Sequence, residues 1–282
     1  MGRGRVFAIC LVKSEDDIIA ESLTAAARYC QRIFVIDNGS TDDTWNIVQR
    51  LAEQSSTIVP FEQTLEPFDN GMRSKVYNAM HSELSNDDWW LILDADEFLA
   101  DDPRPVIEAA SNAGADTIRA WIIQFYFTER DAEEYEHGNC NRNQPIFDRR
   151  RYYLINWQEA RLFRNDPRRR WNANSYKPEW LTRVFKRRIL IRHYQYRDPE
   201  QITKRLHLRN GHGQFSHVQA RDWQDVIRDS RHLNFHRDGA PWRFSLSGVL
   251  YFYRRHLYGR LQSAYHGGAV RRMKRLVASN ER

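Results

Sequence analysis

Short apolar runs alternate with amphipathic segments through the first 127 residues. The runs are continuously apolar and rich in β-branched and aromatic residues, which favours buried strands. They cover residues 5–12, 32–37, 56–62, 89–94 and 116–127. The segments between them have apolar residues at helical spacing, at 14–30, 40–54, 72–84 and 103–114. Apolar strands separated by helices predict a mostly parallel α/β sheet covered on both faces.

Two of the predicted helices begin with a capping-box pattern. Ser14 is followed three residues later by Asp17, and Ser40 is followed by Asp43. A serine at the N-cap with an acidic residue three positions on satisfies two free backbone N–H groups. We therefore expect both serines to be N-caps. Pro60 weakens the third strand, because proline cannot donate to a sheet ladder.

Polar clusters follow three of the predicted strands directly. They are Lys-Ser-Glu at 13–15, Asp-Asn-Gly-Ser-Thr-Asp at 37–42 and Asp-Ala-Asp-Glu at 94–97. Ligands of open α/β sheets bind beyond the carboxyl ends of the strands. Three clusters on one edge of a sheet predict a binding site there.

Asp94 and Asp96 carry the most specific chemistry. Side chains at i and i+2 of an extended chain can point the same way. Two carboxylates aimed at one point repel unless a cation lies between them or one of them is protonated. Mg²⁺ or Mn²⁺ fits, since both accept carboxylate and phosphate oxygens. The alternative is a solvated turn that caps the next helix. Asp37 has a similar pair of interpretations, as an acceptor for a ribose or base or as ordinary turn chemistry.

Periodicity weakens after residue 128. A strand is predicted within 187–197, followed by helices at 199–211 and 221–233. The aromatic stretch 152–164 fits either core packing or stacking on a sugar. The segment 247–262 is apolar, aromatic and basic, so it fits a helix packed on the domain or one lying on an anionic membrane surface.

Charge divides the chain. Residues 1–100 carry 8 Lys or Arg against 17 Asp or Glu, and residues 101–282 carry 35 against 20. The basic half suggests an anionic partner, or simply a solvated arginine-rich surface. The three cysteines lack C-x-x-C spacing, which is typical of reduced thiols in a cytoplasmic protein. No apolar run is long enough for a transmembrane helix.

Four motifs together resemble family 2 glycosyltransferases of the GT-A fold. They are LVKSEDDIIAESL, VIDNGSTDDT, GMRSKVYNAM and LILDADEFL, in this order and within residues 5–127. The later RHYQYRDPEQITKR resembles bacterial members with a DADEF-type motif. The resemblance implies a Rossmann-like, mostly parallel central sheet flanked by helices, with an α-rich basic C-terminal extension. It divides the chain into a nucleotide-sugar-binding half of the GT-A domain (1–127), an acceptor-binding and metal-completing half (128–205) and the extension (206–282).

The resemblance also implies an activity, the inverting transfer of a sugar from a UDP- or GDP-sugar to a glycan or lipid-linked acceptor with Mn²⁺ or Mg²⁺. Surface polysaccharide or glycoconjugate synthesis in the cytoplasm, with or without peripheral contact to an anionic membrane, is the expected setting. The residues that match the family's nucleotide-sugar positions are Glu15, Asp37, Arg73 and Asp94, and those that match its metal positions are Asp96 and His193.

The catalytic base has no legible motif. It is expected beyond the fifth strand, and Glu159 is the first choice, because an acid among aromatic and arginine residues suggests a sugar pocket. Asp148 and Glu179 are alternatives, and Glu159 could equally be an ion-pair partner of Arg161 or Arg164. A rival for the whole chain is a non-catalytic protein that binds nucleic acid or an anionic surface. No groove-reading motif is visible, so no specific nucleic acid is expected.

Overall fold

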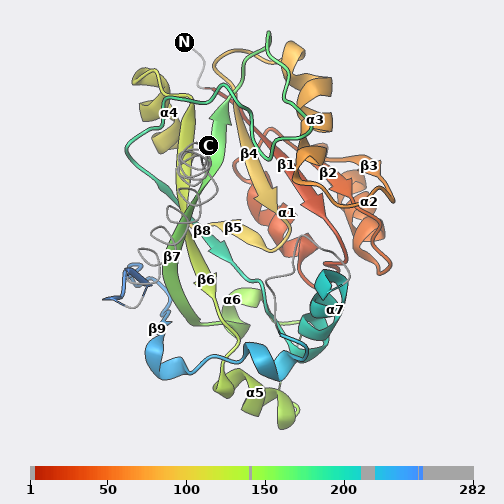
Figure 1. Ribbon diagram of the computed structural model, residues 1–282, viewed down its shortest axis with the longest axis vertical. Helices are drawn as coiled ribbons and strands as arrows, with labels where there is room; N and C mark the ends of the chain where they lie inside the picture. Colours follow the sequence, from red (N-terminus) through yellow and green to blue (C-terminus); the bar gives the residue numbers. More distant parts are fainter. Residues whose placement is uncertain (1–3, 140–141, 211–219, 247, 250–282) are drawn as a thin grey trace, which may run out of the picture.

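The described chain forms a nine-stranded sheet with helices on both faces (Figure 1). The computed structural model describes residues 4–139, 142–210, 220–246 and 248–249. The strand order is β3-β2-β1-β4-β7-β6-β8-β5, and β9 pairs with β7. All strands run in one direction except β5 and β7, so the predicted mostly parallel α/β sheet is confirmed. The strands are β1 (Val6–Val12), β2 (Arg32–Asp37), β3 (Ile58–Gln63), β4 (Trp89–Asp94), β5 (Glu97–Leu99), β6 (Thr117–Phe125), β7 (Tyr152–Arg164), β8 (Ile189–His193) and β9 (Asn234–Phe235).

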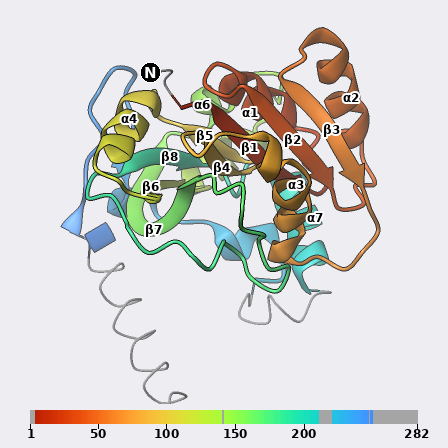
Figure 2. The ribbon, with the colours of Figure 1, turned by 90° about the horizontal axis from the view of Figure 1, so that it is seen from above.

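Side chains on β1 alternate between two hydrophobic cores. Ala8 and Cys10 pack on the face covered by α1, α2 and α4, while Phe7 and Ile9 pack on the face covered by α3. Figure 2 shows α1 and α3 on opposite sides of β1 and β2. The helices are α1 (Ile19–Ala27), α2 (Thr44–Gln54), α3 (Arg73–Met80), α4 (Arg104–Asn112), α5 (Glu129–Glu136), α6 (Ile146–Arg149) and α7 (Pro199–Asn210). Burial on both faces explains why these strands are apolar throughout.

The third strand lies at the edge of the sheet. β3 pairs only with β2, and the ladder shifts register between Val35 and Ile36, opposite Pro60. A proline is tolerated on an edge strand, since one side of that strand needs no hydrogen bonds. The expected weakening by Pro60 is therefore accommodated without loss of the strand.

Both predicted serine caps are wrong. α1 begins at Ile19 and α2 at Thr44, and neither has a side-chain cap hydrogen bond. Instead the Ser14 backbone N–H donates to Ser40 Oγ at 2.8 Å, which joins the loops after β1 and β2. Ser14 has a φ of 55°, a left-handed conformation that costs energy for a residue other than glycine. The polar residues of these loops serve contacts between loops rather than helix termini.

The second half of the sheet holds the elements that periodicity did not reveal. β7 lies antiparallel between β4 and β6, and its pairing with β6 shifts register twice. Each shift breaks the two-residue alternation that identifies a strand. β5 is only three residues long and pairs antiparallel with β8. It turns the end of the acidic motif into a strand.

The C-terminal region differs from expectation where it is described. The helix predicted over 199–211 is confirmed as α7, but the helix predicted over 221–233 is wrong. Two short 3₁₀ helices, η4 (Trp223–Val226) and η5 (Ser230–His232), occupy that segment, so the described part of the extension is not α-rich. The segment 247–262 lies outside the described residues apart from 248 and 249.

The predictions on cysteines and on membrane-spanning helices can be compared with the described residues. Cys10 and Cys30 are buried free thiols, and Cys140 lies outside the described residues. In the part of the chain that the structure describes, every helix is too short or too polar to cross a membrane.

Candidate active site

A cavity of about 1500 Å³ opens at the carboxyl ends of β1 and β4. Its other walls come from β6, β7, β8 and α7. α7 is distant from β1 and β2 in the sequence, but in the fold it lies next to their carboxyl ends (Figure 1). Lys204 and Arg205 of α7 contact Asp42 and Glu15 in the loops there. Six residues predicted from the sequence line the cavity, which are Glu15, Arg73, Asp94, Asp96, Glu159 and His193.

The two aspartates of the acidic motif have separate cationic partners. Asp94 ends β4 and forms ion pairs with Arg73 at 2.5 Å and with Arg161 at 3.3 Å. Burial opposes ionisation of Asp94, but the charges of Arg161 and Arg73 hold its pKa below the usual value. The crowding of like charges is thus relieved by arginines from α3 and β7. The predicted divalent cation near the two carboxylates stays a prediction.

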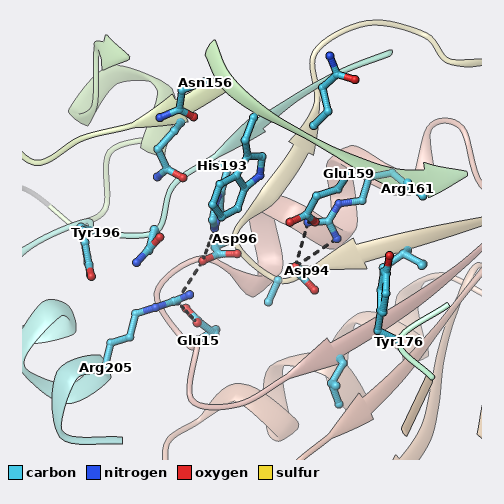
Figure 3. A pocket seen from close by; sticks show the side chains of 18 of the residues that line it. Glu15, Asp94, Asp96, Asn156, Glu159, Arg161, Tyr176, His193, Tyr196 and Arg205 are labelled. Carbon is cyan, nitrogen blue, oxygen red and sulfur yellow. Dashed lines mark hydrogen bonds and ion pairs between the residues drawn. The ribbon is translucent and has the colours of Figure 1, made fainter. Parts of the chain in front are cut away.

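Asp96 points to the opposite side, toward β8 and α7. Its Oδ2 lies 3.3 Å from His193 Nε2 and 3.0 Å from Arg205 Nη1 (Figure 3). Although burial opposes it, the interactions with His193 and Arg205 hold the pKa of Asp96 well below its usual value. His193 reaches this position because β8 pairs with β5, in which Glu97 is its register partner.

The Asp96–His193 pair fits a divalent cation that takes only two ligands from the protein. Among the described residues, no three His, Cys, Asp or Glu side chains gather as a metal-binding set. Asp96 Oδ2 and His193 Nδ1 are both buried and form no hydrogen bond within the described structure. Mg²⁺ and Mn²⁺ commonly bind through one or two protein ligands and complete their coordination with phosphate oxygens and water. The protein groups present are therefore compatible with such an ion.

Glu97, which had no predicted role, binds an arginine of the site. It is fully buried, and its Oε1 accepts a 2.5 Å hydrogen bond from Arg161 Nη2. Burial raises the pKa of Glu97 well above its usual value, although Arg161 opposes the shift. Arg161 also lies 2.8 Å from Glu159 and contacts Asp94, so Glu97 helps to hold the arginine that joins these two carboxylates.

Only one of the three candidates for the catalytic base lies in the cavity. Glu159 lines it and is 42% exposed, on β7 opposite Ala120 of β6. Asp148 forms an ion pair with Arg151 at 2.9 Å, and it does not line the cavity. Glu179 accepts a hydrogen bond from Asn172 at 3.2 Å and also lies outside. The Glu159–Arg161 ion pair anticipated as an alternative is present too.

Asp37 is placed behind the cavity wall. It is buried at the end of β2, and its Oδ1 accepts a hydrogen bond from the Ser40 backbone N–H at 2.8 Å. Its Oδ2 is buried and has no hydrogen-bond partner among the described residues. The next residue, Asn38, lines the cavity. An unsatisfied buried carboxylate oxygen is costly unless a ligand supplies a donor.

Sequence reasoning missed the arginines that surround Glu15. Arg197 is fully buried and binds Asp17 through two hydrogen bonds, while its Nη2 also donates to Glu15. Arg205 donates to the other oxygen of Glu15 at 2.7 Å. Burial raises the pKa of Glu15, with both arginines opposing. Both arginines belong to the RHYQYRDPEQITKR motif, which resembled the family without suggesting roles for them.

Arg209 adds a further cation to this wall. It lines the cavity one helical turn after Arg205. Burial lowers its pKa to about 10, and the neighbouring charge of Arg205 acts in the same direction. Two arginines this close favour an anion in the adjoining space.

The sheet is mostly parallel, and acidic residues at its strand ends line a highly charged cavity. This arrangement is consistent with the GT-A type of α/β fold. The model of the family described as glycosyl transferase family 2 matches residues 8–167. The chain therefore belongs to glycosyl transferase family 2, and it is a glycosyltransferase. This assignment favours an enzyme over the rival non-catalytic binder.

Two solved structures illustrate how distant the similar folds are. Mannosyltransferase PcManGT from Pyrobaculum calidifontis, in complex with GDP-Man and Mn²⁺, is 13% identical with a TM-score of 0.39, over 100% of this chain and 81% of that one. GalNAc-T7 with UDP, GalNAc and Mn²⁺ is 11% identical with a TM-score of 0.35, over 44% of this chain and only 24% of that one. A search of curated proteins finds no match.

Proposed function

We propose that this protein is an inverting, metal-dependent glycosyltransferase that moves a sugar from a UDP- or GDP-sugar to an acceptor hydroxyl. The observation that carries the proposal is the meeting of Glu15, Asp94, Asp96 and His193 in one cavity with six arginines. This cavity lies at the strand ends where α/β folds bind nucleotides.

The donor would lie along the charged wall. Asp37, predicted to contact the base, lies behind the cavity wall, so the loop that covers it would have to shift for its Oδ2 to accept a hydrogen bond from the base. Arg73, at the start of α3, would bind the base or a phosphate. Asp94 would face the ribose. Asp96 and His193 would hold Mn²⁺ or Mg²⁺, which supplies positive charge to the leaving diphosphate. Arg161 and Arg205 would add fixed cations on either side of that charge.

The acceptor would lie against the uncharged part of the cavity lining formed by Gln124, Tyr126 and Asn156. Gln124 stands between His193 of β8 and Leu154 of β7 in the sheet register, and Asn156 donates to the Tyr126 hydroxyl at 2.7 Å. Amides and aromatic side chains of this kind bind sugar hydroxyls and sugar faces without any net charge. The chemistry of this wall supports a glycan acceptor, attached or not to a lipid.

Glu159 lies on β7 between Asn156, proposed to face the acceptor, and Arg161, which pairs with Asp94, so it suits the role of a base. In one displacement, Glu159 would remove the proton from the acceptor hydroxyl while the oxygen of that hydroxyl attacks the anomeric carbon. The bond from that carbon to the diphosphate breaks on the opposite side, so the configuration inverts. Arg161 holds the Glu159 carboxylate in place at 2.8 Å. A role in polysaccharide or glycoconjugate synthesis follows from such an acceptor.

The experiment is a donor-hydrolysis screen with a panel of UDP- and GDP-sugars, in the presence of Mn²⁺, Mg²⁺ or EDTA. We expect one nucleobase to be preferred and hydrolysis to require the metal. The matching nucleoside diphosphate should raise the melting temperature only when the metal is present, because a ligand that binds the folded state stabilises it by mass action. Equal hydrolysis in EDTA would refute the metal dependence.

A further inference from the structure

Arg205 lies between two acids of the cavity, Glu15 and Asp96, which follow different strands. Its Nη1 lies 2.7 Å from Glu15, in the loop after β1, and 3.0 Å from Asp96, in the turn after β4. Its side chain is 17% exposed and reaches both carboxylates from α7 (Figure 3). Arg205 thus pairs with both acids. Arg197 also pairs with Glu15, but its Nη1 lies farther from the same Asp96 oxygen, at 3.9 Å, so Arg205 is the nearer guanidinium.

The two contacts of Arg205 are not equivalent. The contact with Glu15 is a hydrogen bond, whereas the contact with Asp96 is an ion pair without hydrogen-bond geometry. Asp96 Oδ2 therefore keeps its lone pairs, and the same oxygen faces His193. An ion pair that lacks a directed hydrogen bond is the more easily exchanged of the two.

A divalent cation held by Asp96 and His193 would compete with Arg205 for this oxygen. Two cations on one carboxylate repel each other, unless an anion arrives to share the charge. A nucleoside diphosphate supplies such an anion. Arg205 and Arg209 lie at i and i+4 on one face of α7 and both line the cavity, so they flank a space suited to phosphate oxygens.

We propose that Arg205 is an internal counter-ion that blocks the metal position at Asp96 until a nucleoside diphosphate binds, and that it then shifts from Asp96 to the diphosphate. This inference rests on the proposed function, and it adds an order of loading. Metal binds weakly to the empty protein and tightly together with the nucleotide. By linkage, the nucleotide also binds more tightly with metal, by the same factor.

The test is a Mn²⁺ titration of the full chain, followed by electron paramagnetic resonance of free Mn²⁺, with and without UDP or GDP. Without nucleotide, Arg205→Gln should bind Mn²⁺ about tenfold more tightly than the wild type, because the variant lacks the cation that competes for Asp96 Oδ2. At saturating Mn²⁺, the same variant should bind the diphosphate about tenfold more weakly, because it lacks one phosphate ligand.

Lys204→Gln is the matched control. Lys204 precedes Arg205 on α7, but it pairs with Asp42 and does not line the cavity. Both titrations should match the wild type for this variant. Arg205→Lys keeps a cation on the same turn, so the nucleotide dependence of Mn²⁺ binding should largely return.

The outcomes separate this inference from the proposed function. If the wild type binds Mn²⁺ and nucleotide together, but Arg205→Gln binds Mn²⁺ alone no better than the wild type, the counter-ion role is wrong and the proposed function stands. If the wild type binds Mn²⁺ equally tightly with and without nucleotide, the order of loading is also wrong, whatever the variants do. If no Mn²⁺ binds under any condition, both the inference and the metal-dependent function fail.

Discussion

The two halves of the sheet contribute opposite charges to one site. The half built from β1 to β4 supplies carboxylates at its strand ends, and the half built from β6 to β8 and α7 supplies guanidinium groups. Ion pairs in and around the cavity join the two halves, at Glu15–Arg197, Asp17–Arg197, Asp42–Lys204, Asp94–Arg161, Asp96–Arg205 and Glu97–Arg161. The acidic first half and basic second half of the sequence are partners of each other.

This pairing changes the interpretation of the net charge. A basic second half suggested an anionic partner from outside the protein, yet many of its cations already face acids within the chain. Such internal pairs hold the two halves together and also keep the cavity charged. The nucleoside diphosphate of the proposed function would be an anionic partner that enters the cavity.

The largest loss of stability is expected when Arg197, which pairs with acids of the first half, is replaced. Arg197→Ala removes a fully buried cation from Asp17 and Glu15, and we expect a loss of about 3–5 kcal/mol in the free energy of unfolding, because two buried carboxylates lose their partner. Urea denaturation measures the loss. Arg168→Ala, at an exposed arginine, is the control and should change little. An unchanged midpoint for Arg197→Ala would show that the halves do not depend on this pair.

Asp96→Asn should remove activity while leaving the fold in place. The amide cannot hold a divalent cation or balance His193 as the carboxylate does, so we expect kcat/KM for sugar transfer to fall about 10²–10³-fold, as when other groups that stabilise transition-state charge are removed. Steady-state kinetics measures this, with circular dichroism to verify folding. Asp102→Asn, at an exposed aspartate paired with Arg104, is the matched control. Near wild-type turnover by Asp96→Asn would exclude a metal role for this residue.

Glu159→Gln tests whether Glu159 is the catalytic base. The amide keeps the shape but cannot accept a proton, so transfer should slow by about 100-fold or more. Binding of the nucleoside diphosphate should change far less, which separates a base from a donor ligand. Asp148→Asn and Glu179→Gln, outside the cavity, should transfer sugar at the wild-type rate. A slow Asp148→Asn and a normal Glu159→Gln would reverse the assignment.

The smallest effect is expected at an exposed pair between the halves. Asp87 is 65% exposed and contacts Arg164 of β7 at 2.5 Å. Asp87→Asn should cost no more than about 1 kcal/mol of unfolding free energy, since water screens such pairs. The same urea experiment gives the value. A loss as large as that of Arg197→Ala would mean that burial is not what distinguishes the two pairs.

The sequence predicted the first half far better than the second. β1, β2 and β4 are buried on both faces, so their apolar runs and the acids that end them are visible without a structure. β7 was not recognised as a strand because its register shifts mix the two faces. The proposed His193 position depends on β5, which is too short to leave a pattern.

The local errors have a common physical origin. Ser14 and Asp17 form a capping-box pattern, but tertiary contacts with Ser40 and Arg197 outweigh a helix cap of about 1 kcal/mol. The arginines of α7 were unassigned because a helix pattern does not show which distant carboxylates it will face. Partners from opposite ends of the chain appear only when the sheet is folded.

The short pairing of β5 with β8 places a constraint on chain length. Glu97 faces His193 in the register, and Asp96 immediately precedes this ladder. Successive side chains of a strand point to opposite faces, so one residue gained or lost in β8 would turn His193 away from Asp96. Insertions and deletions here are therefore more damaging than most substitutions. Related proteins that keep this site should vary in the residues around the ladder but not in the number of residues within it.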